Sequence, residues 1–172
     1  MELLSIMWDV ADDEMVKIDL KVKQINRTSF ALSGTVDLRY EFSENTMINA
    51  YAQYYWIYYL QINVITYHSP SGNSDNYREL PYHLSAKVFD CLDKYYNETF
   101  KNFLSCLNLP QIETEARDYK YRQLYIIDRC TLSNDAAPNY LPDGYYKVLA
   151  QFTGETKWSL TGLLYVESIL KK

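Results

Sequence analysis

The chain has 172 residues, of which 48% are hydrophobic, 23% are charged and 18 are tyrosine. This composition excludes a disordered chain, and the length predicts a single domain over residues 1–172. The formal net charge of −5 argues against a nucleic-acid-binding protein, because neutralising a phosphate backbone requires a basic surface.

The N-terminal residues do not have the pattern of a signal peptide. Glu2 stands where a basic residue is expected, and the apolar run over residues 3–8 is short and broken. The charge-free stretch 50–67 contains Gln53, Gln61 and Asn63, which argues against a transmembrane helix. We therefore expect either a cytosolic protein or the mature form of a secreted one.

Apolar and polar residues alternate with a period of two through the first part of the chain, as in half-buried β-strands. Ile18, Leu20 and Val22 alternate with charged residues and predict one strand. The next strand is predicted over residues 29–42, and its apolar face carries Phe30, Leu32, Val36, Leu38, Tyr40 and Phe42. Gly34 lies on the same face, where it marks a bend or a close approach of two backbones.

A long aromatic segment follows, and it alternates as well. Its even positions are Ala52, Tyr54, Trp56, Tyr58, Leu60, Ile62 and Val64. A single strand of this length is unusual, so we expect a bend, a bulge or a hairpin inside the segment. Residues 70–77 are rich in turn-forming residues and predict a polar loop.

Helical spacing occurs once, between residues 85 and 107. The apolar residues that recur at intervals of three or four are Val88, Phe89, Leu92, Tyr96, Phe100, Phe103, Leu104 and Leu107. They predict one helix at about 86–107, with Ser85 as its N-cap. Pro110 cannot continue a helix and is expected to follow its end.

Alternation returns in the C-terminal part and predicts strands over 119–128, 146–152 and 158–166. Residues 153–156 (TGET) are expected to form the hairpin turn between the last two strands. About seven strands joined mainly by hairpins, with one helix, predict a mainly β fold, namely an antiparallel β-sandwich or β-cup.

Residues that could carry catalytic chemistry are few. The two histidines, His68 and His83, have no zinc-ligand spacing to another histidine or cysteine, and we expect both to lie in solvated loops. A serine or cysteine paired with one of them in space is the alternative. The sequence contains no glycine-rich phosphate loop. We therefore expect a protein that is not an enzyme and that uses no cofactor or metal.

The three cysteines are Cys91, Cys106 and Cys130. Their spacing leaves two readings equally open: a bridge from Cys106 to Cys130 that joins the helix to the sheet, or three buried thiols in a cytosolic protein. Two glycosylation sequons begin at Asn26 and Asn97. Asn26 lies at a predicted turn tip, where a sugar could be accommodated.

The aromatic face formed by Tyr54, Trp56 and Tyr58 also has two readings. Large rings on one face of a strand are usually core. Tyrosine also suits the wall of a ligand cavity, because it combines apolar area with a polar tip.

Several stretches, in the same order along the chain, resemble the insect chemosensory Che-type proteins, especially the CheA group. These stretches are residues 18–36 (IDLKVKQINRTSFALSGTV), 67–73 (YHSPSGN), 103–110 (FLSCLNLP), 142–147 (PDGYYK) and 152–155 (FTGE). Residues 112–120 lack a Cys-Pro element of that family, and the segment 50–65 is longer and more aromatic than the family pattern.

The family looks related to the ganglioside-activator and ML lipid-recognition proteins. The resemblance implies a secreted β-cup that holds a lipid or hydrocarbon between its sheets, and a role in contact pheromone detection in gustatory sensilla. It also implies a disulfide between Cys106 and Cys130, which match the family's cysteine positions.

Together, these observations predict a non-enzymatic secreted protein that binds an apolar ligand such as a lipid or cuticular hydrocarbon, and that meets a membrane receptor. The alternative is a β-sandwich with a packed interior that binds another protein. The residues expected to line or close the cavity are Phe30, Leu38, Tyr54, Trp56, Tyr58, Leu60, Phe89, Leu92, Phe103, Val148, Phe152, Trp158 and Leu160.

Overall fold

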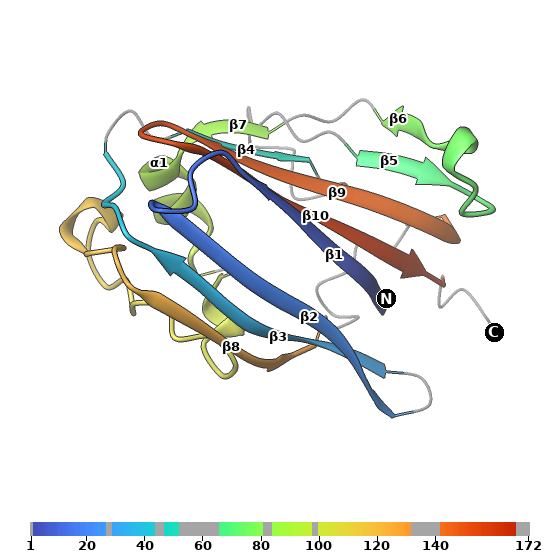
Figure 1. The fold of residues 1–172 in the computed structure, drawn as a ribbon, viewed down its shortest axis with the longest axis horizontal. Coiled ribbons are helices and arrows are strands. Elements are labelled where there is room, and N and C mark those ends of the chain that lie inside the picture. The colour runs from blue at the N-terminus through green and yellow to red at the C-terminus, as the bar shows by residue number, and fades with distance from the viewer. Residues whose placement is uncertain are drawn as a thin grey trace.

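The computed structural model describes residues 2–26, 29–43, 47–51, 66–80, 84–97, 100–131 and 142–167. Within these ranges, ten strands form two antiparallel sheets, and one α-helix accompanies them. The prediction of a mainly β, antiparallel sandwich is therefore confirmed (Figure 1), although the described strands outnumber the seven expected. No helix in these ranges is long and apolar enough to cross a membrane.

The larger sheet has seven strands. Its main order is β1 (Glu2–Val10), β10 (Lys157–Val166), β9 (Gly144–Thr153), β4 (Met47–Tyr51) and β7 (Leu84–Lys87), while β5 (Thr66–Ser69) pairs with both β9 and β6 (Arg78–Leu80). The turn between β9 and β10 lies at residues 154–156, as the sequence predicted. On the inner face of this hairpin, Trp158 pairs with Phe152 and Leu160 with Ala150.

The smaller sheet has the order β2 (Val16–Asn26), β3 (Ser29–Leu38) and β8 (Leu124–Cys130). Burial alternates along β2, since Val16, Ile18 and Leu20 are buried while Lys17 and Asp19 are exposed. The strand predicted from residue 119 begins only at Leu124. Residues 116–118, just before the predicted start, form a 3₁₀ turn. The backbone N–H groups of residues 121 and 122 then donate hydrogen bonds to the Glu41 carboxylate, not to a neighbouring strand.

Strands β4 and β5 lie along β9 in one continuous register. Tyr51, at the end of β4, pairs with Leu149, and Thr66, at the start of β5, pairs with the next residue of β9, Val148. Residues 52–65 therefore connect Tyr51 and Thr66, whose partners on β9 are adjacent residues. The predictions made for the aromatic positions of this segment lie outside the described residues.

The predicted helix at about 86–107 is too long. Helix α1 covers Val88–Tyr95, its N-cap is Lys87, and the predicted cap Ser85 lies in β7. The chain after the helix forms a 3₁₀ turn at Phe100–Phe103 and then reaches β8 through the Cys106–Cys130 disulfide. Leu107 forms an antiparallel bridge with Ile127, and the N–H of Asp128 donates to the backbone oxygen of Cys106, so tertiary contacts override the helical spacing here.

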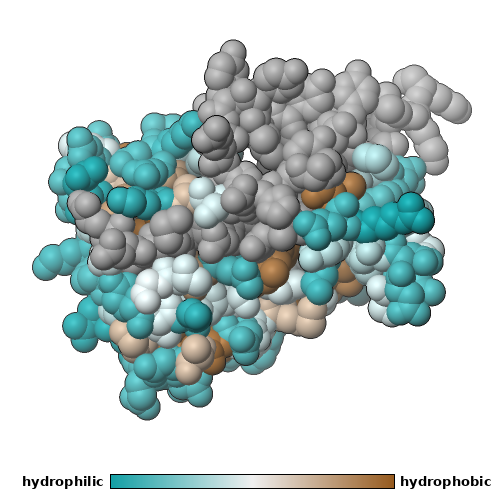
Figure 2. All heavy atoms as spheres, turned by 90° about the horizontal axis from the view of Figure 1, so that it is seen from above, coloured by the Kyte–Doolittle hydropathy of each residue, from teal (hydrophilic) through white to brown (hydrophobic). Residues whose placement is uncertain are grey.

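The main core lies between the two sheets. It combines buried residues of the smaller sheet with Trp158 of the larger one. Figure 1 shows the ribbons of the two sheets close together near the turn between β1 and β2 and spreading apart toward the other end. Seen from above, the described surface is mostly hydrophilic, with a few apolar side chains near its middle (Figure 2).

Candidate ligand-binding site

One end of the sandwich is filled by its own side chains. The ring of Trp158 stacks on Phe152 with centroids 3.8 Å apart, and its Nε1 donates a hydrogen bond of 3.0 Å to the hydroxyl of Tyr40. Burial raises the pKa of Tyr40. Leu38 is buried and Leu160 packs against the same cluster. These four predicted cavity residues, Leu38, Phe152, Trp158 and Leu160, therefore lie in or against packed core.

Packing loosens along the smaller sheet away from that end. Val16, Ile18 and Leu20 are buried, but Val22 on the same face of β2 is only half-buried. Its partner on β3 is Leu32, and the next inward position of that strand is Phe30. Both are half-buried. The inward face is thus still apolar where it is no longer fully covered.

The inner face of the larger sheet is half-buried along most of its length. Beyond Phe152, the inward residue Val148 is half-buried, and it pairs with Gly162. Farther along, Tyr146 and Val166 form a separate small cluster. The candidate ligand site consists of the inward, half-buried apolar residues of both sheets beyond the packed end. These residues, which we call the open-end residues, are Val22, Phe30 and Val148. Leu32 packs against the main core and Leu164 against the cluster of Tyr146 and Val166.

The predicted lid residues of the helix contribute to a second cluster. Phe89 and Leu92 pack against buried Tyr96, Ile112, Ala116 and Tyr121. The hydroxyl of Tyr121 donates to the backbone oxygen of Ala116 at 2.9 Å, and burial raises the pKa of Tyr121. Phe89 and Leu92 therefore hold the helix against the segment 112–121.

Five predicted cavity side chains lie outside the described part of the chain. They are the side chains of Tyr54, Trp56, Tyr58, Leu60 and Phe103.

The disulfide between Cys106 and Cys130 is confirmed. A bulge in β8 makes the disulfide compatible with the core. Gly34 pairs with Ile127 and Leu32 with Cys130, so two residues of β8, Asp128 and Arg129, lie opposite one residue of β3. Arg129 takes up the extra length with a φ of 53°, and both Ile127 and Cys130 can face inward.

Cys91 is free and buried. Burial raises its pKa to about 12, which keeps it protonated at neutral pH and makes it a poor nucleophile.

His68 is not in a solvated loop, contrary to the prediction. It is half-buried in β5, with its ring 4.8 Å from that of Tyr146 and its Nε2 3.2 Å from the backbone oxygen of Asp143. The adjacent Ser69 is fully buried, and its Oγ accepts a hydrogen bond of 3.0 Å from the N–H of Gly72. His68 and Ser69 thus form hydrogen bonds to the backbone of nearby loops. His83 lies outside the described residues.

The two sequon asparagines, Asn26 and Asn97, are exposed.

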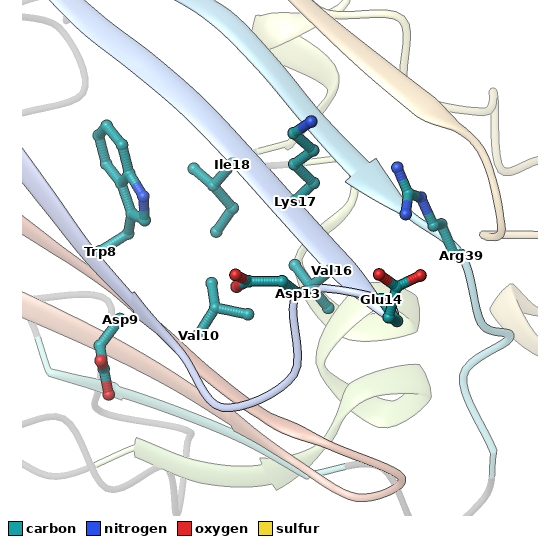
Figure 3. A pocket seen from close by; sticks show the side chains of 9 residues that line it. All are labelled: Trp8, Asp9, Val10, Asp13, Glu14, Val16, Lys17, Ile18 and Arg39. Carbon is teal, nitrogen blue, oxygen red and sulfur yellow. The ribbon is translucent and has the colours of Figure 1, made fainter.

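A groove of about 520 Å³ lies between the edges of the two sheets. Its apolar residues are Trp8 and Val10 of β1 and Val16 and Ile18 of β2. Its charged residues are Asp9, Asp13, Glu14, Lys17 and Arg39 (Figure 3). The apolar run over residues 3–8 was considered only as a leader, so the groove was not predicted. The alternating apolar residues Ile6, Trp8 and Val10 are the signal that would have predicted β1.

Residues 62–148 match the family model described as "Protein of unknown function (DUF1091)". The chain belongs to this family. The DUF1091 match spans β5 to β8, the helix and the first half of β9, so it includes both disulfide cysteines and His68. Strands β1 to β4, β10 and the groove's lining residues lie outside it. No curated protein matches the chain.

Within the described part of the chain, no group of three or more His, Cys, Asp or Glu side chains is arranged to hold a metal ion. The described site presents mainly apolar surface to a ligand. The chemistry it supports best is therefore binding by exclusion of water.

Proposed function

We propose that this protein is a non-enzymatic carrier that holds a lipid, hydrocarbon or other apolar ligand between its two sheets. The observation that carries the proposal is that both sheets have apolar residues that face inward and are only half-buried. Apolar residues such as Val22, Phe30 and Val148 still face inward where the sheets no longer cover them fully. Apolar surface removed from water contributes about 25 cal/mol per Å², so a long-chain ligand there would gain enough to offset the loss of its free motion.

The resemblance to Che-type chemosensory proteins supports a finer assignment to contact chemosensation, with a membrane receptor as the partner. The disulfide supports a secreted location, because disulfides persist in oxidising compartments and are rare in the cytosol. The exposure of Asn26 and Asn97 is compatible with glycosylation of a secreted chain. The DUF1091 family description assigns no function, so these assignments rest on the resemblance and the disulfide.

The test is displacement of the fluorescent probe N-phenyl-1-naphthylamine by oleic acid and by tricosane. Val148→Glu places a charge on the inner face and is expected to weaken probe binding at least about tenfold, because a carboxylate is costly to bury in an apolar site. Leu149→Glu is the matched control, since Leu149 is the half-buried neighbour on the opposite face of β9, and it should change affinity less than about twofold. Circular dichroism would verify that both variants fold.

Two outcomes would contradict the carrier proposal. One is a folded wild-type protein that binds none of the three apolar compounds, which would favour a packed module that binds another protein. The other is equal weakening by the two glutamate variants, which would place the probe elsewhere than between the sheets.

A further inference from the structure

The groove between β1 and β2 is built from the edges of both sheets. Strand β1 is the last strand of the larger sheet and β2 is the last strand of the smaller one, and a short turn at residues 11–15 joins them. The groove's volume of about 520 Å³ is within the range of sites that bind small molecules. Two of its apolar lining residues also belong to the main core, since Val16 is fully buried and Ile18 is 8% exposed.

Trp8 provides an aromatic surface beside these two residues. It pairs with Leu160 of β10 and therefore lies on the inward face of β1. Yet 39% of Trp8 is exposed, against 6% of Trp158 on the same face. A large ring on the inward face is thus left accessible at the groove.

The charged side chains that line the groove differ in whether they extend toward its interior. In Figure 3, the carboxylate of Asp13 extends into the gap between Val10 and Ile18, whereas Lys17 extends away from Asp13. Among the residues that the structure describes, no cation pairs with Asp13. The other nearby cation, Arg39, forms an ion pair of 2.7 Å with Asp37, and this contact raises the pKa of Arg39.

We propose that this groove binds an organic cation, namely an amine or quaternary ammonium group that carries an apolar chain. The charged nitrogen lies against the Trp8 ring and is attracted by the Asp13 carboxylate, and the chain covers Val10 and Ile18. Aromatic faces attract cations, most strongly when the ring is indole. This site lies at the sheet edges and does not depend on the carrier function proposed above.

Calorimetric titration with octyltrimethylammonium tests the proposal, with octyl sulfate as the anion of equal chain length. The wild-type protein is expected to bind the cation, and Trp8→Ala and Asp13→Asn are each expected to weaken binding roughly tenfold. The matched control is Asp19→Asn, because Asp19 is an exposed carboxylate of β2 paired with Lys21 at 3.3 Å. It should leave the affinity unchanged.

A second measurement places the ligand. The indole N–H signal of Trp8 in a nuclear magnetic resonance spectrum, assigned by its loss in Trp8→Phe, should shift with octyltrimethylammonium. Binding of octyl sulfate with equal or higher affinity would overturn the proposal in favour of an anion site at Lys17 and Arg39. Unchanged cation affinity in Asp13→Asn, whose exposed side chain is not needed for folding, would also overturn it. Val148→Glu should not alter the affinity, which separates this site from the carrier site.

Discussion

Gly34 is a position in β3 where a side chain cannot be accommodated. Its φ is +138°, and a Cβ built on it would lie 2.0 Å from the backbone oxygen of Asp19 on β2. The backbones of β2 and β3 must therefore move before any other residue fits. We expect Gly34→Ala to lower the free energy of unfolding by at least about 3 kcal/mol, since both backbone strain and a clash contribute. Urea denaturation monitored by circular dichroism would measure the change.

Gly162 in β10 is the matched control for Gly34. A Cβ added at Gly162 would have Leu3 Cδ1 as its nearest neighbour, at 3.5 Å, which is ordinary van der Waals contact. Gly162→Ala should therefore change the free energy of unfolding by less than about 1 kcal/mol. Equal losses in the two variants would show that the close approach at Gly34 is not the cause.

Elements with a strict alternation could be predicted from the sequence, and those shaped by contacts distant in the chain could not. The inward faces of β2 and β3 follow directly from alternating residues such as Ile18 and Leu20. The helix prediction over 86–107 is too long because nothing local signals that Leu107 pairs with Ile127 of β8. His68 was assigned to a loop because its strand, β5, has only four residues and is defined by pairing with β9 and β6.

The candidate site, too, could be predicted only in part from the sequence. Alternation identified which residues face inward, including Phe30 and Val148, but it could not separate packed positions from half-buried ones. Trp158 and Phe152 lie in the packed end because the sheets are close there, and the separation of two sheets is not encoded in the pattern of either. The groove at Trp8 was missed for a similar reason, since it is formed by two sheet edges.

The continuous register of β4 and β5 leads to a prediction about the segment between them. Tyr51 and Thr66 pair with successive residues of β9, so removing the fourteen residues 52–65 would join two positions that are already neighbours along the sheet. We expect this deletion variant to fold with the same disulfide. Its free energy of unfolding should fall by no more than about 2 kcal/mol, because the pairs that β4 and β5 form with β9 are all kept. Urea denaturation and mass spectrometry of the non-reduced protein would check both points.

A deletion shorter by one residue, of 52–64, is the control. It adds one residue to the strand, and a shift of one residue turns every following side chain to the other face of the sheet. His68 would leave its contact with Tyr146, or the strand would have to bulge. This variant should be less stable than the fourteen-residue deletion, and equal stability of the two would refute the continuous register.

Two packed regions in the described part of the chain differ in how they are held. The sandwich core is stabilised by both sheets, whereas the helix packs against the segment 112–121 in a separate cluster. Phe42 contacts both, with its ring 5.8 Å from Tyr40 and 5.3 Å from Tyr121. The Cys106–Cys130 disulfide joins the chain after the helix to β8. Loss of the disulfide should therefore weaken the attachment of the helix region to the sandwich.

Replacing both bridged cysteines by serine tests this coupling. The two cysteines are 24 positions apart, and a loop of that length restricts the unfolded chain enough to contribute about 3 kcal/mol. We expect the double variant to lose about that much free energy of unfolding in urea, with faster amide hydrogen exchange in residues 100–121 than in β9 and β10. Cys91→Ala is the control, because it removes a buried thiol and leaves the bridge intact; it should not speed exchange in residues 100–121. If exchange in the double variant rises equally in the sandwich strands, the two regions unfold as one unit and the disulfide stabilises the molecule as a whole.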